Sequence, residues 1–425
     1  MTTHEPGGRS RRHDVAADHD AHDHAHDHDG APDQRGRRDH DEHDHPSRAA
    51  TTSARLRGAE QLIAVLPQLI GYQIDHSVVV VAARLGGPHG RSVGQMIFTG
   101  RLDLPPPEAM SDHLDSIRTA LLQADDGSPG PVLLTVVGYD LPEREPGHVD
   151  EEHVIALEAA ADRLADTTGA HVHDLLLVRD EGRETYGVRR DGEHVPPPER
   201  GWRPTPPAAD VPVAADLVLQ GRVALPSRAA LAELVRRRDE PAARATALAL
   251  GILDLDPTRH DPGAMLRALT AWLTDGVPPT AGQRAGIAWT LADREVRDAV
   301  LARWLPELGW DDGLGQDGAR DLCAGLAAFP GEGWREPVGR LLALAGEVPH
   351  PFDSAVLTMV AMVSWVRGDG TLANEAVDTA LERDPRYTLA RLLRRMLEAG
   401  LRPPRGAGVG ARPDRRSGGR SPMRL

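Results

Sequence analysis

SVVVVAARL, residues 77–85, is the stretch of sequence that decides the fold. Four consecutive valines are stiff about χ1 and favour a β-strand, and an unbroken apolar run predicts a strand that is buried on both faces of its sheet. Before it, Leu62, Ile63, Leu66, Leu69 and Ile70 recur at three- and four-residue spacing. That spacing predicts a short amphipathic helix, with Pro67 at a kink and Gly71 at its end.

Further strands and helices follow this first strand. Helical periodicity over residues 108–124 and 151–168 separates short apolar runs, and a Gly/Pro/His loop favours a hairpin between the first two strands. We therefore predict an α/β domain over residues 54–195, built as a mixed sheet with helices, in which strands joined through a helix run parallel. The further strands that we expect are QMIFTGRLDLPPP (95–107), which is broken by its prolines 105–107, PVLLTVVGY (131–139), HVHDLLLVRD (171–180) and ETYGV (184–188).

The pattern then changes to an almost continuous helical periodicity. Residues 196–212 are rich in proline and predict an extended linker or an ordered crossover. Residues 213–400, rich in Ala, Leu and Arg, predict an all-α domain. Near its end, Ala361, Ala373, Ala380 and Pro385 fall at the relative positions of a tetratricopeptide-type helical hairpin. Because a single unit is found, we expect a hairpin that caps a bundle and not a peptide-binding solenoid.

Both ends of the chain lack the apolar residues that a core needs. Residues 1–53 are rich in His and Asp and residues 401–425 in Arg and Gly, so we expect two disordered tails. Neutral imidazole is a common ligand for Zn²⁺ and Ni²⁺, so the N-terminal tail predicts metal chelation. A His-Asp repeat without a metal role is the alternative. The histidines concerned are His19, His22, His24, His26, His28, His40, His43 and His45.

Two absences exclude whole classes of chemistry. Cys323 is the single cysteine, which excludes an internal disulfide, a Cys-based zinc finger and a protein-held iron–sulfur cluster. Its Ala/Leu/Gly-rich surroundings predict a buried, inert thiol. All 49 basic residues are arginine, which excludes a Walker A loop and a Schiff-base lysine, because both need a primary amine.

Charge and hydropathy constrain the partners and the location. The net charge of −15 disfavours nucleic acid as the main partner. We expect weak nucleic-acid binding only from the C-terminal arginine-rich tail. No apolar run is long enough to span a bilayer and the N-terminus does not read as a signal peptide. We therefore expect a cytoplasmic protein without a membrane partner, whose protein partner, if it has one, binds the helical domain.

Four residues near the predicted strand ends are candidates for a ligand pocket: Ser77, Arg101, Asp103 and Tyr139. Arg101 and Asp103 alternate to the same face, so a structural salt bridge is the alternative for that pair. Asp75, His76 and Ser77 are the residue types of a hydrolase triad, but adjacent residues on a strand alternate in direction and do not converge.

Two further groups of residues resemble metal ligands. His171 and His173 flank Val172 on a predicted strand and share one face, and Asp174 and His153 are candidates to complete a site. Exposed polar residues at a strand edge are the alternative. Asp254, Asp256, His260 and Asp261 resemble a site for a hard cation, but Asp before Pro or at a helix start more often caps or turns the chain.

Several segments in collinear order resemble the domain-of-unknown-function 4192 family, known from high-GC Gram-positive bacteria. They include LRGAEQLIAVLPQLIGYQIDHSVVVVAARL, FTGRLDLPPP, VLLTVVGYD, VPVAADLVLQGRVALPSRAALAELV and WVRGDGTLANEAVDTALERDPRYTLARLL. The resemblance implies no activity and no site residues. The chain departs from the family where Gly71-Tyr72-Gln73-Ile74 replaces the usual Gly-Phe-His-Pro, where His76 replaces an acidic residue, and where a cysteine pair after the last strand is missing.

These observations leave two classes of function open. The first is a non-enzymatic scaffold or regulatory interaction module that carries a metal-chelating tail. The second is an enzyme or small-ligand-binding protein whose pocket lies at the strand ends of the α/β domain. A polar pocket with converging arginine and carboxylate side chains would favour the second, and an exposed apolar groove on the helical domain would favour the first.

Overall fold

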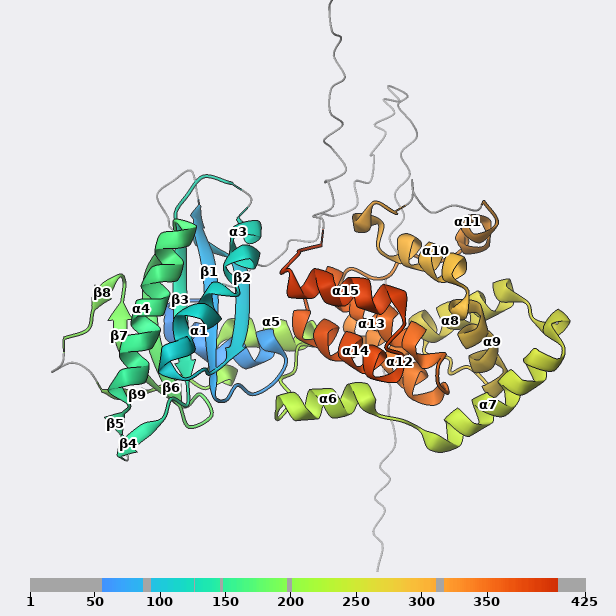
Figure 1. The fold of residues 1–425 in the computed structure, drawn as a ribbon, viewed down its shortest axis with the longest axis horizontal. Helices are drawn as coiled ribbons and strands as arrows, with labels where there is room; N and C mark the ends of the chain where they lie inside the picture. Colours follow the sequence, from blue (N-terminus) through green and yellow to red (C-terminus); the bar gives the residue numbers. More distant parts are fainter. Residues whose placement is uncertain are drawn as a thin grey trace, which may run out of the picture. The chain divides into compact units, whose positions relative to one another are not determined.

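The computed structural model describes residues 56–86, 93–125, 127–145, 148–196, 201–310 and 317–403. By its contacts the chain divides into two units, and every described residue belongs to the second, Ser53–Leu425. The predictions for the N-terminal tail, and for the C-terminal tail beyond residue 403, lie outside the described residues. The second unit contains a mixed sheet with helices, followed by a helical region (Figure 1).

The strand that contains the four valines lies inside the sheet, as its composition predicts. β1 (Ser77–Gly86) pairs antiparallel with both β2 (Val93–Asp103) and β3 (Val132–Tyr139). β3 pairs parallel with β6 (His171–Arg179), and β7 (Glu184–Arg190) returns antiparallel to β6. The sheet is therefore mixed, and its parallel pair is joined through a long helix, as expected.

Four short strands were not anticipated from the sequence. Two- and three-residue strands are too short to show a period of two, so no hydrophobic alternation marks them. Trp202–Pro204, inside the proline-rich stretch, pairs with β7. The four are β4 (Glu143–Glu145), β5 (His148–Val149), β8 (Glu193–His194) and β9 (Trp202–Pro204).

The helical segment expected at residues 108–124 is interrupted. It consists of η1 (Pro107–Ala109), α2 (Met110–Asp115) and α3 (Arg118–Ala124). The Ser116 hydroxyl donates to the carbonyl oxygen of His113 at 2.6 Å, and such bonds compete with the helical ladder. α4 (Glu151–Thr168) matches its predicted bounds, and α1 (Ala59–Ile70) ends before Gly71, as predicted.

The two faces of β1 supply two different cores. Val78 and Val80 pack in a cluster with residues of α2, α3 and α4, whereas Val79 and Val81 pack in a cluster that contains residues of α1. Successive side chains of a strand point to opposite faces, so one apolar strand serves both clusters. The α1 cluster continues into the helical region, where it includes most of α13.

The helical region packs around one helix that is buried along almost its entire length. α13 is apolar on all sides, which is typical of a helix enclosed by others, and it contacts α9, α12, α14 and α15 (Figure 1). The α-helices are α5 (Pro212–Leu219), α6 (Arg228–Arg236), α7 (Glu240–Leu255), α8 (Pro262–Asp275), α9 (Ala281–Ala292), α10 (Arg294–Trp304), α11 (Asp317–Cys323), α12 (Arg335–Glu347), α13 (Asp353–Val366), α14 (Gly370–Arg383) and α15 (Thr388–Glu398). Among the described residues, the 3₁₀ turn η3 (Ala208–Asp210) precedes α5, and η4 (Pro257–Arg259) and η5 (Pro306–Leu308) lie between later helices.

Backbone hydrogen bonds join the sheet region to the helical region. The Gln73 amide donates to the Leu225 carbonyl at 2.8 Å, and the Leu225 amide donates to the Gly71 carbonyl at 2.9 Å. These bonds attach the segment between α1 and β1 to the chain that precedes α6. Among the described residues, no helix has the length and apolarity that a bilayer crossing requires.

Gly346 provides a test of the packing of α12. A Cβ at this buried position would lie 2.6 Å from the Arg237 carbonyl oxygen, whereas a Cβ at Gly339 of the same helix would meet nothing within 4 Å. We expect Gly346→Ala to lower the free energy of unfolding by about 1–3 kcal/mol, because backbone has to move. Gly339→Ala should raise it by roughly 0.5–1 kcal/mol. Urea unfolding of both variants measures the difference, and equal effects would show that α12 does not pack closely at Gly346.

Candidate functional site

The register of the sheet brings the four predicted pocket residues to one face. Ser77 lies opposite Asp103 on β2 and opposite Tyr139 on β3, and Val79 lies opposite Arg101. Cross-strand partners share a face, as do residues two apart on one strand. Ser77, Arg101, Asp103 and Tyr139 therefore all lie on the face that α1 covers.

Two of these four residues belong to the core. Ser77 and Tyr139 are buried, and the Ser77 hydroxyl donates to the backbone oxygen of Asp75. This bond does not involve His76, whose side chain is exposed, so these three residues do not form a triad. The Tyr139 hydroxyl is buried without a hydrogen-bond partner among the described residues, and burial raises the pKa of Tyr139.

Arg101 lines a cavity between the sheet and the helical region. The cavity has a volume of about 290 Å³ and includes the end of α1, the middle of β2, the first residue of α6 and the start of α14. It is near the lower end of the size range of small-molecule sites. Its polar side chains include those of Tyr72, Thr99, Arg101, Arg228, Asn374 and Glu375.

Tyr72 is the residue of this cavity whose polar group is least satisfied. Only 1% of the residue is exposed, and no described residue accepts from or donates to its hydroxyl. The Arg101 guanidinium lies 5.8 Å from the centre of the Tyr72 ring, and the Arg101 Nε is buried without a hydrogen-bond partner. Burial raises the pKa of Tyr72, while the charges of Arg101 and Arg228 act in the opposite direction.

A chain of alternating charges closes one side of the cavity. Arg101 forms an ion pair with Asp103 at 2.5 Å, so the predicted salt bridge is confirmed. The other oxygen of Asp103 lies 3.8 Å from Arg228, whose Nε donates to Glu375 at 3.0 Å. The Glu375 side chain is only 8% exposed. These contacts connect β2 to α6 and α14, which fixes both arginines at the cavity.

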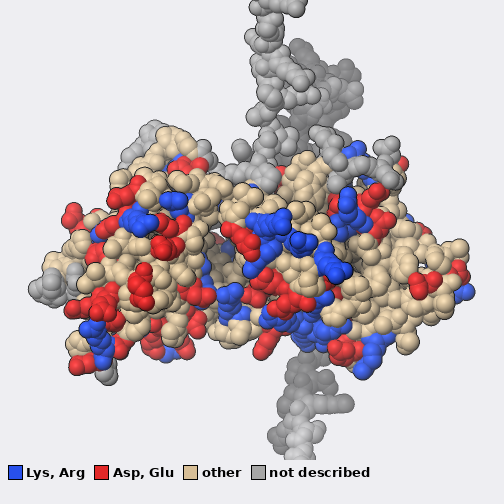
Figure 2. Space-filling model, viewed as in Figure 1, with Lys and Arg blue, Asp and Glu red and all other residues tan. Residues whose placement is uncertain are grey.

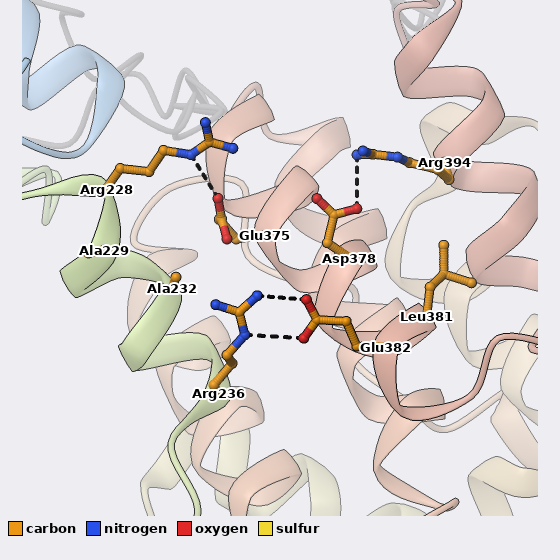
Figure 3. Close-up of a pocket in the computed structure, with 9 residues that line it drawn as sticks. All are labelled: Arg228, Ala229, Ala232, Arg236, Glu375, Asp378, Leu381, Glu382 and Arg394. Atoms are coloured by element: carbon orange, nitrogen blue, oxygen red, sulfur yellow. Dashed lines mark hydrogen bonds and ion pairs between the residues drawn. The ribbon is translucent and has the colours of Figure 1, made fainter. Parts of the chain in front are cut away.

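The Arg228–Glu375 pair also borders a second, open groove of about 700 Å³ between α6 and α14. Figure 3 shows Arg236 and Glu382 joined by two parallel bonds, and Arg394 directed at Asp378. Burial raises the pKa of Asp378. Figure 2 shows positive and negative side chains interleaved over α6, α14 and α15. We call this surface the ion-paired groove.

The thiol of Cys323 is buried, and the carboxylates of the cavity are paired with arginines. Cys323, the only thiol, is buried among other residues, and burial raises its pKa to about 11, so it stays protonated at neutral pH. Both carboxylates of the cavity are engaged by arginines: Asp369 by Arg335 at 2.7 Å and Glu375 by Arg228. The Arg101 Nε remains a donor without a hydrogen-bond partner among the described residues.

The structure brings some of the residues predicted to bind metal close together and leaves others apart. The donor atoms of His173, Asp174 and Asp191 lie within 4.8 Å of one another. His171 is not part of this group, and His153 pairs with Asp150 at 2.7 Å. Sequence reasoning missed Asp191, although its Asp-Gly pair is a hairpin-turn signal next to a strand end. The tail histidines lie outside the described residues.

The Asp254–Asp261 group behaves as capping and turn residues. Asp256 bonds to Thr258 and Arg259 of the following turn, and Asp261 accepts from the Ala264 amide at the start of α8. His260 lies 3.0 Å from the Thr290 hydroxyl, and burial lowers its pKa. These contacts agree with the structural alternative for this group.

Sequence reasoning identified Arg101 and Asp103 but missed their partners in the cavity. Tyr72 follows a helix-ending glycine and carries no motif. Glu375 was open to detection, because it lies on the same helical stripe as Leu372 and Thr379, at positions expected to be apolar. A charged residue there indicates a buried partner, but the sequence does not say that the partner is Arg228.

Comparisons with known proteins identify a family and no function. A family model described as "Domain of unknown function (DUF4192)" matches residues 60–404. No curated protein and no solved structure matches the chain. The family match covers both the sheet and the helical region, so the cavity lies inside the matched part.

Tyr139 provides a test of the buried sheet face. We expect Tyr139→Phe to raise the free energy of unfolding by about 1 kcal/mol, because it removes a buried hydroxyl that has no partner. Tyr387→Phe is the matched control: its hydroxyl accepts from Arg297 at 2.6 Å, so its loss should cost about 1–3 kcal/mol. Urea unfolding of the two variants should give opposite signs, and a destabilised Tyr139→Phe would reveal a partner for that hydroxyl.

Proposed function

The chain belongs to the DUF4192 family, whose description states no activity, and we propose that it is a non-enzymatic binding protein for a small carboxylate. The ligand binds in the cavity beside Arg101. The observation that carries this proposal is that the Arg101 guanidinium and the hydroxyl of the buried Tyr72, which has no hydrogen-bond partner among the described residues, both line one partly open polar cavity.

The donor groups favour an anionic ligand. A carboxylate oxygen accepts hydrogen bonds and carries negative charge, so it matches both the Tyr72 hydroxyl and the guanidinium groups of Arg101 and Arg228. Ligands of this kind are commonly held by arginine because its planar fork pairs with both oxygens. The volume of about 290 Å³ limits the ligand to a small metabolite.

The position of the cavity supports a regulatory role. Its walls come from the sheet and from the helical region, so a ligand that contacts Arg101 and Glu375 together stabilises their present arrangement. A ligand shifts a conformational equilibrium only by its difference in affinity between the two states. Ligand binding at this junction would therefore change the surface of the helical region that a partner protein contacts, to an extent set by the ligand concentration.

An interaction module remains the second candidate function. α13 and α14 are joined by three residues and form a helical hairpin, whose tetratricopeptide character is still a prediction. The ion-paired groove beside α14 is favoured as the contact surface for a polypeptide that carries both signs of charge. The cytoplasmic location, the chelating N-terminal tail and weak nucleic-acid binding by the C-terminal tail also remain predictions.

Calorimetric titration of the full chain tests carboxylate binding. The probes are acetate, succinate and L-glutamate, with inorganic phosphate as the comparison anion. We expect saturable binding of at least one carboxylate, and Tyr72→Phe should weaken it about 2–10-fold, the effect of one hydrogen bond. This variant has phenylalanine, the residue that the family resemblance gives as usual here. Tyr139→Phe, outside the cavity, should bind as the wild type does.

Two charge variants separate binding from stability. Asp103→Asn and Arg101→Gln both break the same ion pair, but only the second removes the guanidinium. We expect Arg101→Gln to reduce carboxylate affinity by roughly 10–100-fold, as for a hydrogen bond to a charged group, while Asp103→Asn has a much smaller effect. If both variants bind equally well, or if no carboxylate binds the wild type, the proposed function is wrong.

A further inference from the structure

A second polar cluster lies on the sheet, where β6 begins and the turn between β7 and β8 approaches it. It consists of His173 and Asp174 of β6 and Asp191 of the turn. None of these residues lines the cavity beside Arg101, so the cluster is independent of the proposed carboxylate site.

An irregularity in β6 allows two adjacent side chains to converge. In the pairing with β3, Leu134 lies opposite Val172 and Thr135 lies opposite Asp174, so the register passes over His173. An extra residue of this kind is a β-bulge, which redirects side chains that would otherwise alternate. The bulge explains how neighbouring residues, His173 and Asp174, bring donor atoms within 4.8 Å of each other.

The third residue, Asp191, lies in a tight turn between β7 and β8. Asp191 and Gly192 have φ values of +51° and +83°, as in the two-residue turn that an Asp-Gly pair favours in a hairpin. The turn is attached to the bulge by two hydrogen bonds: the Gly192 amide donates to the His173 carbonyl at 2.7 Å, and the Asp191 amide donates to an Asp174 carboxylate oxygen at 3.3 Å. The position of Asp191 beside His173 is therefore built into the backbone.

The three donor atoms are those of a divalent metal site. The set offers one imidazole nitrogen and two carboxylate oxygens, ligand types that Zn²⁺ accepts at about 2.0–2.2 Å. In a tetrahedral site such bonds place donor atoms about 3.3–3.6 Å apart, so the three donor atoms, which lie within 4.8 Å of one another, would have to move closer together. Asp191 is 91% exposed and His173 36% exposed in their side chains, which leaves both free to make that movement.

Neighbouring charges are compatible with a cation. The His173 Nε2 lies 3.3 Å from an Asp191 oxygen, an arrangement in which a metal ion would replace the weak contact between the two. Arg190 is the nearby positive charge, and its guanidinium is engaged by Glu60 of α1. The Asp174 residue is 9% exposed, so its carboxylate is less hydrated than one on the open surface, and a bound cation would stabilise its charge.

We propose that His173, Asp174 and Asp191 form a divalent transition-metal site, with Zn²⁺ as its ligand. Two carboxylates and one imidazole leave coordination positions for water, as in sites that are open on one side. The site would fasten the β7–β8 turn to the bulge of β6. It does not require the N-terminal histidines.

Thermal unfolding of the full chain with and without Zn²⁺ tests this proposal. We expect Zn²⁺ to raise the unfolding midpoint by about 2–4 °C when the ion is well above its dissociation constant, because a ligand that binds the folded state stabilises it. His173→Gln and Asp191→Asn should abolish the rise. Asparagine tolerates positive φ, so Asp191→Asn keeps the turn. Mn²⁺ and Mg²⁺ serve as comparison ions.

His171→Gln is the matched control. His171 lies two residues away on the same strand and is exposed, but it is outside the cluster, so this variant should keep the full response to Zn²⁺. Every variant retains the N-terminal histidines, so a difference between His173→Gln and His171→Gln reports the folded sheet. Equilibrium dialysis should show one bound Zn²⁺ fewer in His173→Gln than in His171→Gln. An unchanged midpoint in the wild type, or equal responses in the two variants, would overturn the proposal.

Discussion

The structure depends on the burial of both faces of β1. Its valines supply alternate side chains to two apolar clusters, one under α2, α3 and α4 and one under α1. The second cluster is continuous with the interior of the helical region, so the sheet and the helices share one core. With so few aromatic residues, this core consists mainly of aliphatic side chains.

Arginine side chains form ion pairs with buried carboxylates of the interior. The buried carboxylate of Asp353 accepts from Arg238 and Arg383 at 3.0 and 2.9 Å and lies 2.9 Å from His350. Removing one member of such a group would leave a buried charge uncompensated. The same type of pairing, between Arg228 and Glu375, forms the wall between the cavity and the ion-paired groove. At the proposed carboxylate site, by contrast, the Tyr72 hydroxyl and the Arg101 Nε have no acceptor among the described residues.

The two proposed sites arise at different kinds of discontinuity. The cavity beside Arg101 lies where packing passes from the sheet to the helices, and polar groups remain because neither region covers them completely. The His173 cluster lies where the ladder between β3 and β6 gains one residue. Both locations follow the general pattern that functional residues occur at the ends and irregularities of a rigid scaffold.

The sequence alone determined the mixed sheet, the burial of β1 on both faces, the end of α1 and the bounds of α4, because hydrophobic periodicity and glycine stops are local signals. The resemblance of several segments also indicated the family. The sequence also indicated the Arg101–Asp103 pair, two residues apart on one strand. Only the tertiary structure decided that Tyr72, Arg228 and Glu375 meet Arg101, and that Asp191 meets His173 in place of His171. Those contacts join residues that are distant in the chain or depend on a one-residue bulge, and neither long-range packing nor a register shift leaves a periodic mark in the sequence.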